Sequence, residues 1–359
     1  MDYKSHLHPK QLIKMSVTNT VFRSTKGKDF TDIKSFKEAI PKVGNHEVLI
    51  EVKAVSLNYR DYGVSNRTYP FPTKDNVVPC SDAAGKVVEV GSGVQDFAVG
   101  DSVISVFDPT NQYGVQRTWN YGWGAPQDGF LQNFKVVQAE GLIKLPSDTH
   151  LSYSEAASLV CTGTTAWNSL YGGKRFTAGE TVLMLGTGGV SITTLILAKA
   201  AGAKTIITSS SDEKLKLVQE KYGADFTINY KTHPNWEKEV LRITEGQGAD
   251  YVIENGGSGT IEKSILSTKR GGDIALIGFL SAPKSLPDVC SLVLGGSVSL
   301  RGIAVGSKQL SEELVNFVHV KKLHMPVEKE FGFTEEEVHA AFKQLESQSH
   351  IGKIVIKVA

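Results

Sequence analysis

The pattern of apolar and polar positions divides the chain into two parts with different periodicity. Up to about residue 155, residues 48–54 and 85–90 alternate apolar and polar side chains, which is typical of half-buried strands. Residues 111–126 are rich in glycine, asparagine and tryptophan, and they indicate a long surface loop. The first part is therefore predicted to form a β-barrel-like domain of short strands.

The second part alternates short apolar runs with helical stretches. Residues 181–185 (TVLML) form a continuous apolar run, as expected of a buried parallel strand, and a helix is predicted over residues 190–201. The alternation continues with strands at 204–208, 226–229, 251–254 and 273–278 and helices at 214–222, 234–244 and 260–267. This order is that of an α/β fold, a doubly wound parallel sheet with helices on its faces.

The pattern changes again after about residue 310. Residues 335–345 predict an amphipathic helix with an acidic start, and residues 353–358 (KIVIKV) predict a terminal strand that returns to the first domain. The expected organisation is an extension at 1–16, a barrel domain at 17–155 plus 311–359, and a parallel-sheet domain at 156–310.

Composition and charge narrow the class of protein. A chain of 359 residues is long enough to form two domains. Its net charge of +1 argues against nucleic-acid binding. The three cysteines are odd in number and far apart, which favours a reducing compartment, and we expect a cytoplasmic protein. No apolar run reaches the length of a membrane span. The first 16 residues lack a secretory h-region, and they are either a frayed extension or a weak targeting peptide.

Residues 185–191 (LGTGGVS) follow a buried strand and open a helix. A nucleotide-binding glycine turn needs this context. Gly186 permits the tight turn, and Gly188 and Gly189 let the backbone approach a diphosphate. With Val190 they begin a helix whose N-terminus offers free N–H groups to that anion. A purely structural glycine turn is the alternative.

The end of the next strand bears on the choice between NAD and NADP. An NAD site normally places an acid there to bind the ribose 2′-hydroxyl. Here Ser209, Ser210 and Ser211 come first, and Asp212 and Lys214 follow. Hydroxyls and a lysine suit a 2′-phosphate, so NADPH is the expected cofactor. Capping of the helix by Ser211 or Asp212 is the alternative, and both interpretations can hold together.

Six motifs stand in order along the chain: residues 56–61 (SLNYRD), 186–191 (GTGGVS), 208–214 (TSSSDEK), 228–230 (INY), 277–279 (IGF) and 300–307 (LRGIAVGS). Together they resemble the zinc-independent branch of the medium-chain dehydrogenase/reductase superfamily, which includes quinone reductases, enoyl reductases and zinc-type alcohol dehydrogenase-like proteins. The resemblance runs from about residue 20 to the end. It implies a GroES-like domain, a Rossmann domain, a cleft between them, and a homodimer formed by edge pairing of the Rossmann sheets.

The resemblance also implies roles for individual residues around NADPH. Lys214 and Tyr230 would hold the 2′-phosphate end, beside the hydroxyl of Ser210, and Thr165 would lie against the nicotinamide ring. The remaining expected contacts are Phe279, Ile303 and Val305 at the nicotinamide and Lys353 at the diphosphate. Lys308 departs from the family pattern, which usually has arginine there, so any bidentate contact at this position is in doubt.

No metal is expected. Asn58, Ser81 and Cys161 stand where zinc-dependent relatives have Cys, His and Cys, and neither Asn nor Ser is a usual zinc ligand. The structural zinc of those relatives needs four close cysteines, and none lies between Gly100 and Leu145. We expect Cys161 to be a small buried residue.

Without zinc, hydrogen-bond donors must polarise the substrate oxygen. The predicted catalytic residues are Asn58, whose amide should face the substrate, and Tyr59 and Tyr69, either of which would donate a proton. Arg60 is a further candidate donor, and ordinary packing is the alternative for each tyrosine. Asp61 is expected to orient the loop.

The predicted function is NADPH-dependent hydride transfer to an activated double bond, a quinone or a carbonyl of a small molecule. A carbonyl reductase or alcohol dehydrogenase, and a nicotinamide-binding protein with little turnover, are the alternatives. A short-chain reductase would need Lys four residues after Tyr, and none of the 11 tyrosines has it. HExxH and GxSxG motifs are absent, which excludes the corresponding peptidases and esterases.

Overall fold

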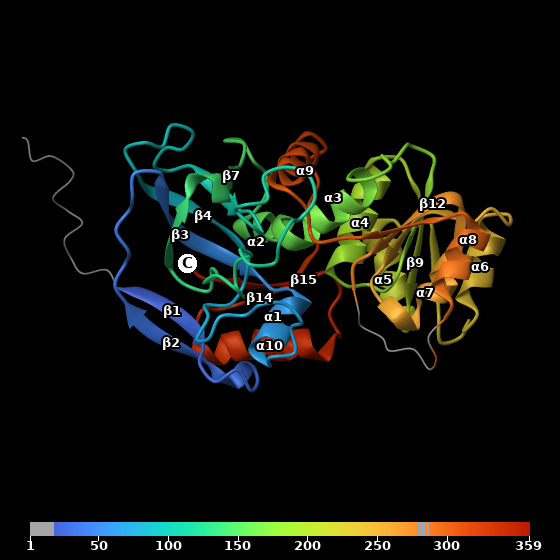
Figure 1. The fold of residues 1–359 in the computed structure, drawn as a ribbon, viewed down its shortest axis with the longest axis horizontal. Coiled ribbons are helices and arrows are strands. Elements are labelled where there is room, and N and C mark those ends of the chain that lie inside the picture. The colour runs from blue at the N-terminus through green and yellow to red at the C-terminus, as the bar shows by residue number, and fades with distance from the viewer. Residues whose placement is uncertain (1–17, 279–284, 286) are drawn as a thin grey trace, which may run out of the picture.

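The structure is a computed structural model, and it describes residues 18–278, 285 and 287–359. The expected extension at residues 1–16 and the expected nicotinamide contact Phe279 lie outside the described residues. Figure 1 shows two lobes, one around the blue and cyan strands and one around the yellow and orange strands, with green helices between them. Each lobe is organised around its own sheet.

A six-stranded parallel sheet forms one lobe, with strand order β10-β9-β8-β11-β12-β13. Its strands are β8 (Thr181–Met184), β9 (Lys204–Ser209), β10 (Phe226–Asn229), β11 (Ala249–Glu254), β12 (Thr268–Leu276) and β13 (Ser299–Gly302). The helices of this lobe are α4 (Gly189–Ala200), α5 (Asp212–Tyr222), α6 (Trp236–Ile243), α7 (Ile261–Leu266) and α8 (Val289–Gly296). Strands β8 and β11 are buried along their whole length, as strands covered on both faces are. The predicted parallel sheet is confirmed.

A seven-stranded sheet forms the other lobe, in the order β14-β15-β3-β4-β5-β7, with β6 also paired to β3. Its strands are β3 (Glu47–Ser56), β4 (Asp82–Val90), β5 (Ser102–Ser105), β6 (Phe134–Gln138), β7 (Leu142–Lys144), β14 (Val327–Phe331) and β15 (Lys353–Lys357). All of its strand pairs are antiparallel except β14 with β15. The last strand, β15, pairs with β3, so the chain does return to its first sheet. The domain limits at residues 155 and 310 stay predictions.

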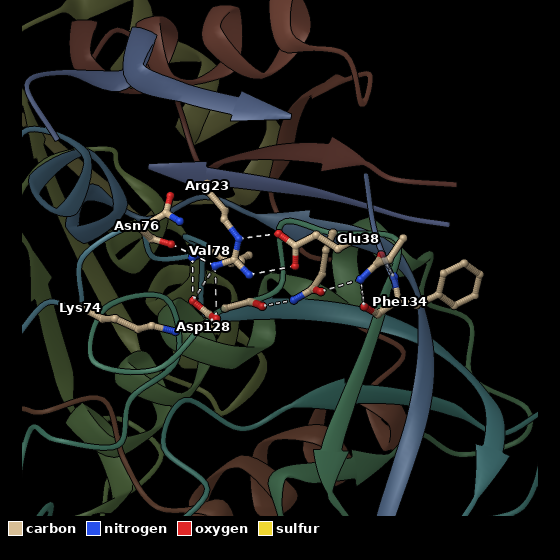
Figure 2. A network of polar contacts seen from close by, with 10 residues as sticks. Arg23, Glu38, Lys74, Asn76, Val78, Asp128 and Phe134 are labelled. Carbon is tan, nitrogen blue, oxygen red and sulfur yellow. Dashed lines mark hydrogen bonds and ion pairs between the residues drawn. The ribbon is translucent and has the colours of Figure 1, made fainter. Parts of the chain in front are cut away.

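A separate hairpin of β1 (Asn19–Ser24) and β2 (Ile33–Glu38) was not predicted. Figure 2 shows the polar network that joins this hairpin to the lobe of the seven-stranded sheet. Arg23 donates from Nε and Nη2 to Glu38 at 2.6 and 3.0 Å, and its Nη1 lies 3.4 Å from a carboxylate oxygen of Asp128. The bonds to Glu38 join the two strands of the hairpin, and the contact with Asp128 ties the hairpin to the loop before β6.

The remaining helices lie between the lobes or against the seven-stranded sheet (Figure 1). They are α1 (Tyr59–Ser65), α2 (Tyr153–Ala157), the π-helical turn η4 (Leu159–Gly163), α3 (Thr164–Tyr171), α9 (Lys308–Val320) and α10 (Glu335–Ser347), which packs against β14 and β15. Short 3₁₀ turns lie at η2 (Phe30–Asp32), η3 (Ala139–Gly141) and η5 (Gly257–Gly259). The run from α2 through η4 to α3 contacts β3 and β4 at its start and α4 at its end, so it bridges the two lobes. In the part of the chain that the structure describes, no helix is long and apolar enough to cross a membrane.

Candidate active site

The glycine turn lies between β8 and α4. Gly186 has a φ of 80°, and a side chain added at Gly186 or Gly188 would meet no atom within 4 Å. A Cβ at Gly189 would instead lie 2.7 Å from Cδ of Lys353. Gly188 is the N-cap of α4 and no side chain caps this helix. The turn therefore has an open face beside uncapped N–H groups, which suits a diphosphate.

The residues expected at the 2′-phosphate lie at the ends of β9 and β10. Ser211 Oγ accepts from the Lys214 N–H at 3.2 Å, so the interpretation of Ser211 as a helix cap is confirmed. Asp212 Oδ1 accepts from Nδ2 of Asn229, the last residue of β10, at 2.8 Å. Lys214 Nζ lies 3.5 Å from the carbonyl of Gln348, and partial burial lowers the pKa of Lys214.

Tyr230 joins this group through the backbone. Its N–H donates to the carbonyl of Ser209 at 3.0 Å, which places it beside Ser210 and leaves its side chain exposed. The structure thus brings Ser210, Lys214 and Tyr230 to one edge of the parallel sheet, as a single site for the cofactor's 2′ end requires.

The residues expected at the nicotinamide lie on α3 and on the loop after β13. Thr165 is buried, and Asn168 lies one turn further along α3 and donates to the carbonyl of Val305 at 2.9 Å. Arg301 Nη1 donates to Asn168 Oδ1 at 2.8 Å and so fixes the orientation of that amide. Val305 has a φ of 55°, a strained value for a β-branched residue, and Ile303 N–H donates to the end of β12. The loop is therefore held in one conformation against α3.

Lys353 lies at the centre of a buried polar network between the lobes. Its side chain is almost enclosed, with the residue 3% exposed. Its Nζ donates to Leu57 O at 2.5 Å, Asn58 Oδ1 at 2.6 Å and Thr162 Oγ1 at 2.9 Å. These acceptors account for all three N–H bonds, so the ammonium is not free for the diphosphate contact expected of Lys353. Its stem, rather than its charge, packs beneath Gly189.

Asp82 supplies the negative charge of this network. It is fully buried, and its carboxylate accepts from Ser81 Oγ at 2.6 Å and from the Cys161 N–H at 3.0 Å. Burial raises the pKa of Asp82, and the charge of Lys353 opposes that rise. Burial, with a smaller effect of Asp82, raises the pKa of Cys161 to about 12, so Cys161 is a thiol at neutral pH. Cys161 is half-buried rather than buried as expected, and it packs against the core of the parallel-sheet lobe.

Asn58 is buried, and the predicted orientation of its amide toward the substrate stays a prediction. It is 8% exposed, its Oδ1 accepts from Lys353 and Thr162, and its Nδ2 has no hydrogen-bond partner among the described residues. Its backbone N–H donates to Asp61 Oδ2 at 2.8 Å, which caps α1 and agrees with an orienting role for Asp61. Burial raises the pKa of Asp61 to about 6, although the nearby Arg60 opposes the rise.

A small pocket adjoins the start of α1, and it is lined by Arg60, Tyr69, Phe107, Gln116, Trp119, Gly122 and Pro126. The Arg60 guanidinium lies 5.1 Å from the ring centre of Tyr69 and 4.8 Å from that of Phe107. The structure thus joins Tyr69 to Arg60, whereas Tyr59 is 38% exposed and its ring lies against Tyr62. Of the three predicted catalytic residues, only Tyr69 lines this pocket.

Known protein families match both lobes of the structure. A family model described as an alcohol dehydrogenase GroES-like domain matches residues 44–147, and one described as a zinc-binding dehydrogenase matches residues 189–319. A zinc-type alcohol dehydrogenase-like protein of Schizosaccharomyces pombe is 39% identical over 337 residues, which cover 92% of this chain and 96% of that protein. The chain belongs to the medium-chain dehydrogenase/reductase family.

Other members of the family agree with this assignment. An acryloyl-coenzyme A reductase of Metallosphaera sedula is 29% identical over 338 residues, with 88% of this chain and 93% of that protein covered. The crystal structure of a putative alcohol dehydrogenase from Sinorhizobium meliloti 1021 superposes with a TM-score of 0.87 at 34% identity, covering 96% of this chain and all of that one. The protein is an oxidoreductase of a family that binds nicotinamide cofactors, and the predicted GroES-like and Rossmann folds are confirmed.

The name of one matching family model implies zinc, and the residues present do not fit it. Asn58 Oδ1 accepts from the Lys353 ammonium and Ser81 Oγ donates to Asp82, so Cys161 is the one usual zinc ligand among the three positions. The Lys353 charge at this place would repel Zn²⁺. Nowhere in the described residues do three or more His, Cys, Asp or Glu side chains gather so as to hold a metal ion.

Sequence reasoning did not select several residues of this medium-chain dehydrogenase/reductase site. Asp82 and Thr162 hold Lys353 and Asn58 in place, and Asn168 holds the loop of Val305. A signal existed for Asp82, because it is a charged residue directly before the small residues 83–85 at the start of a strand. No local signal distinguishes Thr162 or Asn168 from other polar helix residues.

Proposed function

We propose that the protein is an NADPH-dependent reductase that transfers hydride to an activated double bond, a quinone or a carbonyl without zinc. One observation carries this proposal: a glycine turn with an open face lies against the stem of Lys353, whose ammonium donates to Asn58 and Thr162. NADPH, when bound, would supply the hydride that reduces the substrate. A relative named for acryloyl-coenzyme A reduction supports a conjugated double bond as the acceptor.

The residues at the ends of β9 and β10 support NADPH over NADH. Ser210 and Tyr230 offer hydroxyl donors beside the Lys214 ammonium, and Asp212, the acid that follows the three serines, is engaged by Asn229. A phosphate gains charge-assisted hydrogen bonds from such a set.

The chain's own residues would orient the ring and exclude water. The loop of Val305 is fixed by Asn168, so that backbone groups beside it are held for the carboxamide end of the cofactor. Arg60 and Tyr69 supply donors near the substrate, and Phe107 and Trp119 supply apolar walls. A water-poor pocket strengthens the hydrogen bonds that polarise a substrate oxygen.

Titration with both cofactors tests the proposed preference. Lys214→Ala should weaken NADPH binding by at least about tenfold, because it removes the charge opposite the 2′-phosphate, and should change NADH binding by less than about twofold. Lys216→Ala, on the exposed face of the same helix, is the matched control. Equal losses for NADPH and NADH would contradict the 2′-phosphate role.

Turnover and metal content test the reaction. NADPH oxidation should be measured with a panel containing an enone, a quinone, an aldehyde and a ketone, and metal content should be determined on the same protein. Turnover without bound zinc supports the proposal. Stoichiometric zinc that is required for turnover would contradict it, as would tight NADPH binding with no turnover of any compound.

We also propose that the protein is a homodimer and that it works in a reducing compartment such as the cytoplasm. Helix α8 is strongly apolar yet has no buried residue, and β13 beside it is the edge strand of the parallel sheet. An open edge strand and an uncovered apolar helix are features that a second copy would bury. The three cysteines Cys80, Cys161 and Cys290 are unpaired, as in reduced proteins.

A further inference from the structure

The segment between α10 and β15 borders the expected cofactor site at both of its ends. At its start, the carbonyl of Gln348 lies 3.5 Å from Lys214 Nζ. At its end, the Gly352 N–H donates to Thr187 O in the glycine turn at 3.1 Å. His350 is the middle residue of this segment, so it stands between the residues proposed for the 2′-phosphate and those proposed for the diphosphate.

The imidazole of His350 has one nitrogen without a partner. Its Nδ1 is enclosed by protein, yet it forms no hydrogen bond with any described residue. A hydrogen bond with the backbone of Gln344 on α10 stabilises the charged ring, and this bond must belong to the other nitrogen, Nε2. When the ring is neutral, Nδ1 therefore carries the lone pair that a proton would occupy.

Two cations face His350 from neighbouring elements, Lys214 on α5 and Lys353 on β15. Burial has the largest effect on the ring, and the charges of Lys353 and Lys214 add to it, so the pKa of His350 is lowered to about 4. The ring is therefore neutral at pH 7 in the protein without cofactor. It lies among positive charges that an anionic ligand would offset.

The acidic side chains on the adjacent elements are already engaged. Glu328 on β14 lies close enough to Lys214 to oppose the lowering of the Lys214 pKa, and its carboxylate accepts from the Ile351 N–H at 3.1 Å. Glu346 on α10 accepts from the Tyr62 hydroxyl at 2.8 Å. Within the described residues, neither carboxylate bonds the His350 ring, so a proton on this ring needs a counter-ion from a ligand.

We infer that His350 determines cofactor specificity through a proton: its ring is neutral in the free protein and takes up a proton when the 2′-phosphate of NADPH binds beside Lys214. This inference rests on the proposed function. A phosphate monoester carries about −1.5 to −2 charges at pH 7, and these offset the charges of Lys214 and Lys353. The proton comes from solvent, adds to the Nδ1 lone pair, and returns to solvent when the cofactor leaves.

The size of the effect follows from the added charge. One negative charge at about 6 Å, with an effective dielectric constant of about 20, increases the proton affinity of a ring roughly 100-fold. NADH brings the diphosphate without the 2′-phosphate, so it has a smaller effect on His350. Because binding is then coupled to proton uptake, the contribution of His350 to NADPH affinity grows as the pH falls.

Calorimetric titration with NADP⁺ and NAD⁺ at pH 8.0 and 5.5 tests this coupling on the full-length protein. The 2′-phosphate titrates in the same range, so the effect of His350 is measured as the ratio of the affinities of the unmodified protein and His350→Gln. For NADP⁺ this ratio should rise about fourfold between pH 8.0 and 5.5, and for NAD⁺ it should change by less than about twofold. His233→Gln, at an exposed histidine just after β10, is the matched control and should behave as the unmodified protein does.

Nuclear magnetic resonance of protein labelled with ¹⁵N-histidine gives a second readout that needs no variant. The ring signal of His350 should be the one that titrates near pH 4 without cofactor, and its midpoint should lie about two pH units higher with NADP⁺. An unchanged midpoint with NADP⁺, an equal rise with NAD⁺, or a ratio that does not change with pH would overturn the inference. Failure of the unmodified protein to bind NADPH or NADP⁺ would instead contradict the proposed function.

Discussion

Lys353 and Asp82 are buried in one polar network without a direct bond, and the charge of each favours the charged form of the other. Lys353→Met keeps the apolar stem but leaves Asp82 and three oxygen acceptors without the ammonium. Loss of one partner of a buried pair should lower the free energy of unfolding by roughly 3–5 kcal/mol, measured by urea denaturation at pH 7.5. Lys357→Met, on the same strand but exposed beside Glu330, should cost less than about 1 kcal/mol. Equal stability of the two variants would show that Asp82 does not depend on Lys353.

Asp61 should make stability depend on pH in an unusual direction. Its pKa is raised by burial from 3.8 to about 6, so between these values the folded protein binds a proton more tightly than the unfolded chain. The stabilisation from protonated Asp61 is therefore present below about pH 4 and is lost as the pH rises to about 6. Asp61→Asn stays neutral, so its stability relative to the unmodified protein should increase between pH 4.5 and 7 by about 2 kcal/mol.

Urea denaturation of both proteins across this range measures the effect. The difference between the two proteins isolates Asp61 from other titrating groups, because those groups are common to both. A constant difference across the range would mean that Asp61 titrates near its ordinary pKa.

Single residues could be assigned from the sequence only where their partners are close along the chain. Ser211 and Lys214 belong to one helix start, so the local pattern was sufficient to place them. Asn58, Thr162 and Lys353 bond across separations of 104 and 191 residues, and no periodicity connects them. For this reason the sequence did not predict that the Asn58 oxygen accepts from Lys353.

At the level of elements, a substitution in the glycine turn should weaken cofactor binding and leave the stability of the protein almost unchanged. A Cβ at Gly188 meets no protein atom within 4 Å, but it would occupy the open face proposed for the diphosphate. Gly188→Ala should therefore lower NADPH affinity by about tenfold or more, followed by the fluorescence of the bound nicotinamide. The free energy of unfolding without cofactor should change by less than about 1 kcal/mol, as for an N-cap change from Gly to Ala. A variant with normal NADPH affinity would mean that the diphosphate binds elsewhere.

The strands and helices of the parallel sheet were predicted closely because each is a short run with a single periodicity. Strand β10 has the predicted limits, and α5 begins two residues before its predicted start. The run from α2 to α3 was not predicted, because Gly163 and several threonines lower its helix propensity and a π-helical turn interrupts it. That interruption carries Cys161 and Thr162, so the irregular element is the one that builds the site.

At the scale of the whole molecule, the C-terminal segment joins the two lobes at the cofactor site. Gly352 N–H donates to Thr187 O in the glycine turn at 3.1 Å, and the next residue, Lys353, begins a strand of the other sheet. Gln348, on the same segment, accepts from Lys214 at the far end of the expected cofactor site. Neither lobe therefore builds the site alone, and a change in the angle between the lobes would alter the glycine turn and the 2′ end together.

The proposed dimer leads to the last prediction, which concerns assembly. Leu294 on α8 is 82% exposed, and it lies on the helix that packs beside the edge of the parallel sheet. A charge at this position would be buried without a partner in a dimer formed through that edge, so Leu294→Asp should yield a monomer. Light scattering should give twice 38.9 kDa for the unmodified protein and 38.9 kDa for the variant.

Val115→Asp is the control, because Val115 is equally exposed at 82% but lies on a loop of the other lobe. It should keep the dimeric mass, whereas Leu294→Asp should lose it while still binding NADPH, because the glycine turn belongs to a single subunit. A dimer that survives Leu294→Asp would mean that the apolar face of α8 is covered by something other than a second copy. If the unmodified protein is a monomer, the proposed pairing of two subunits through β13 is wrong.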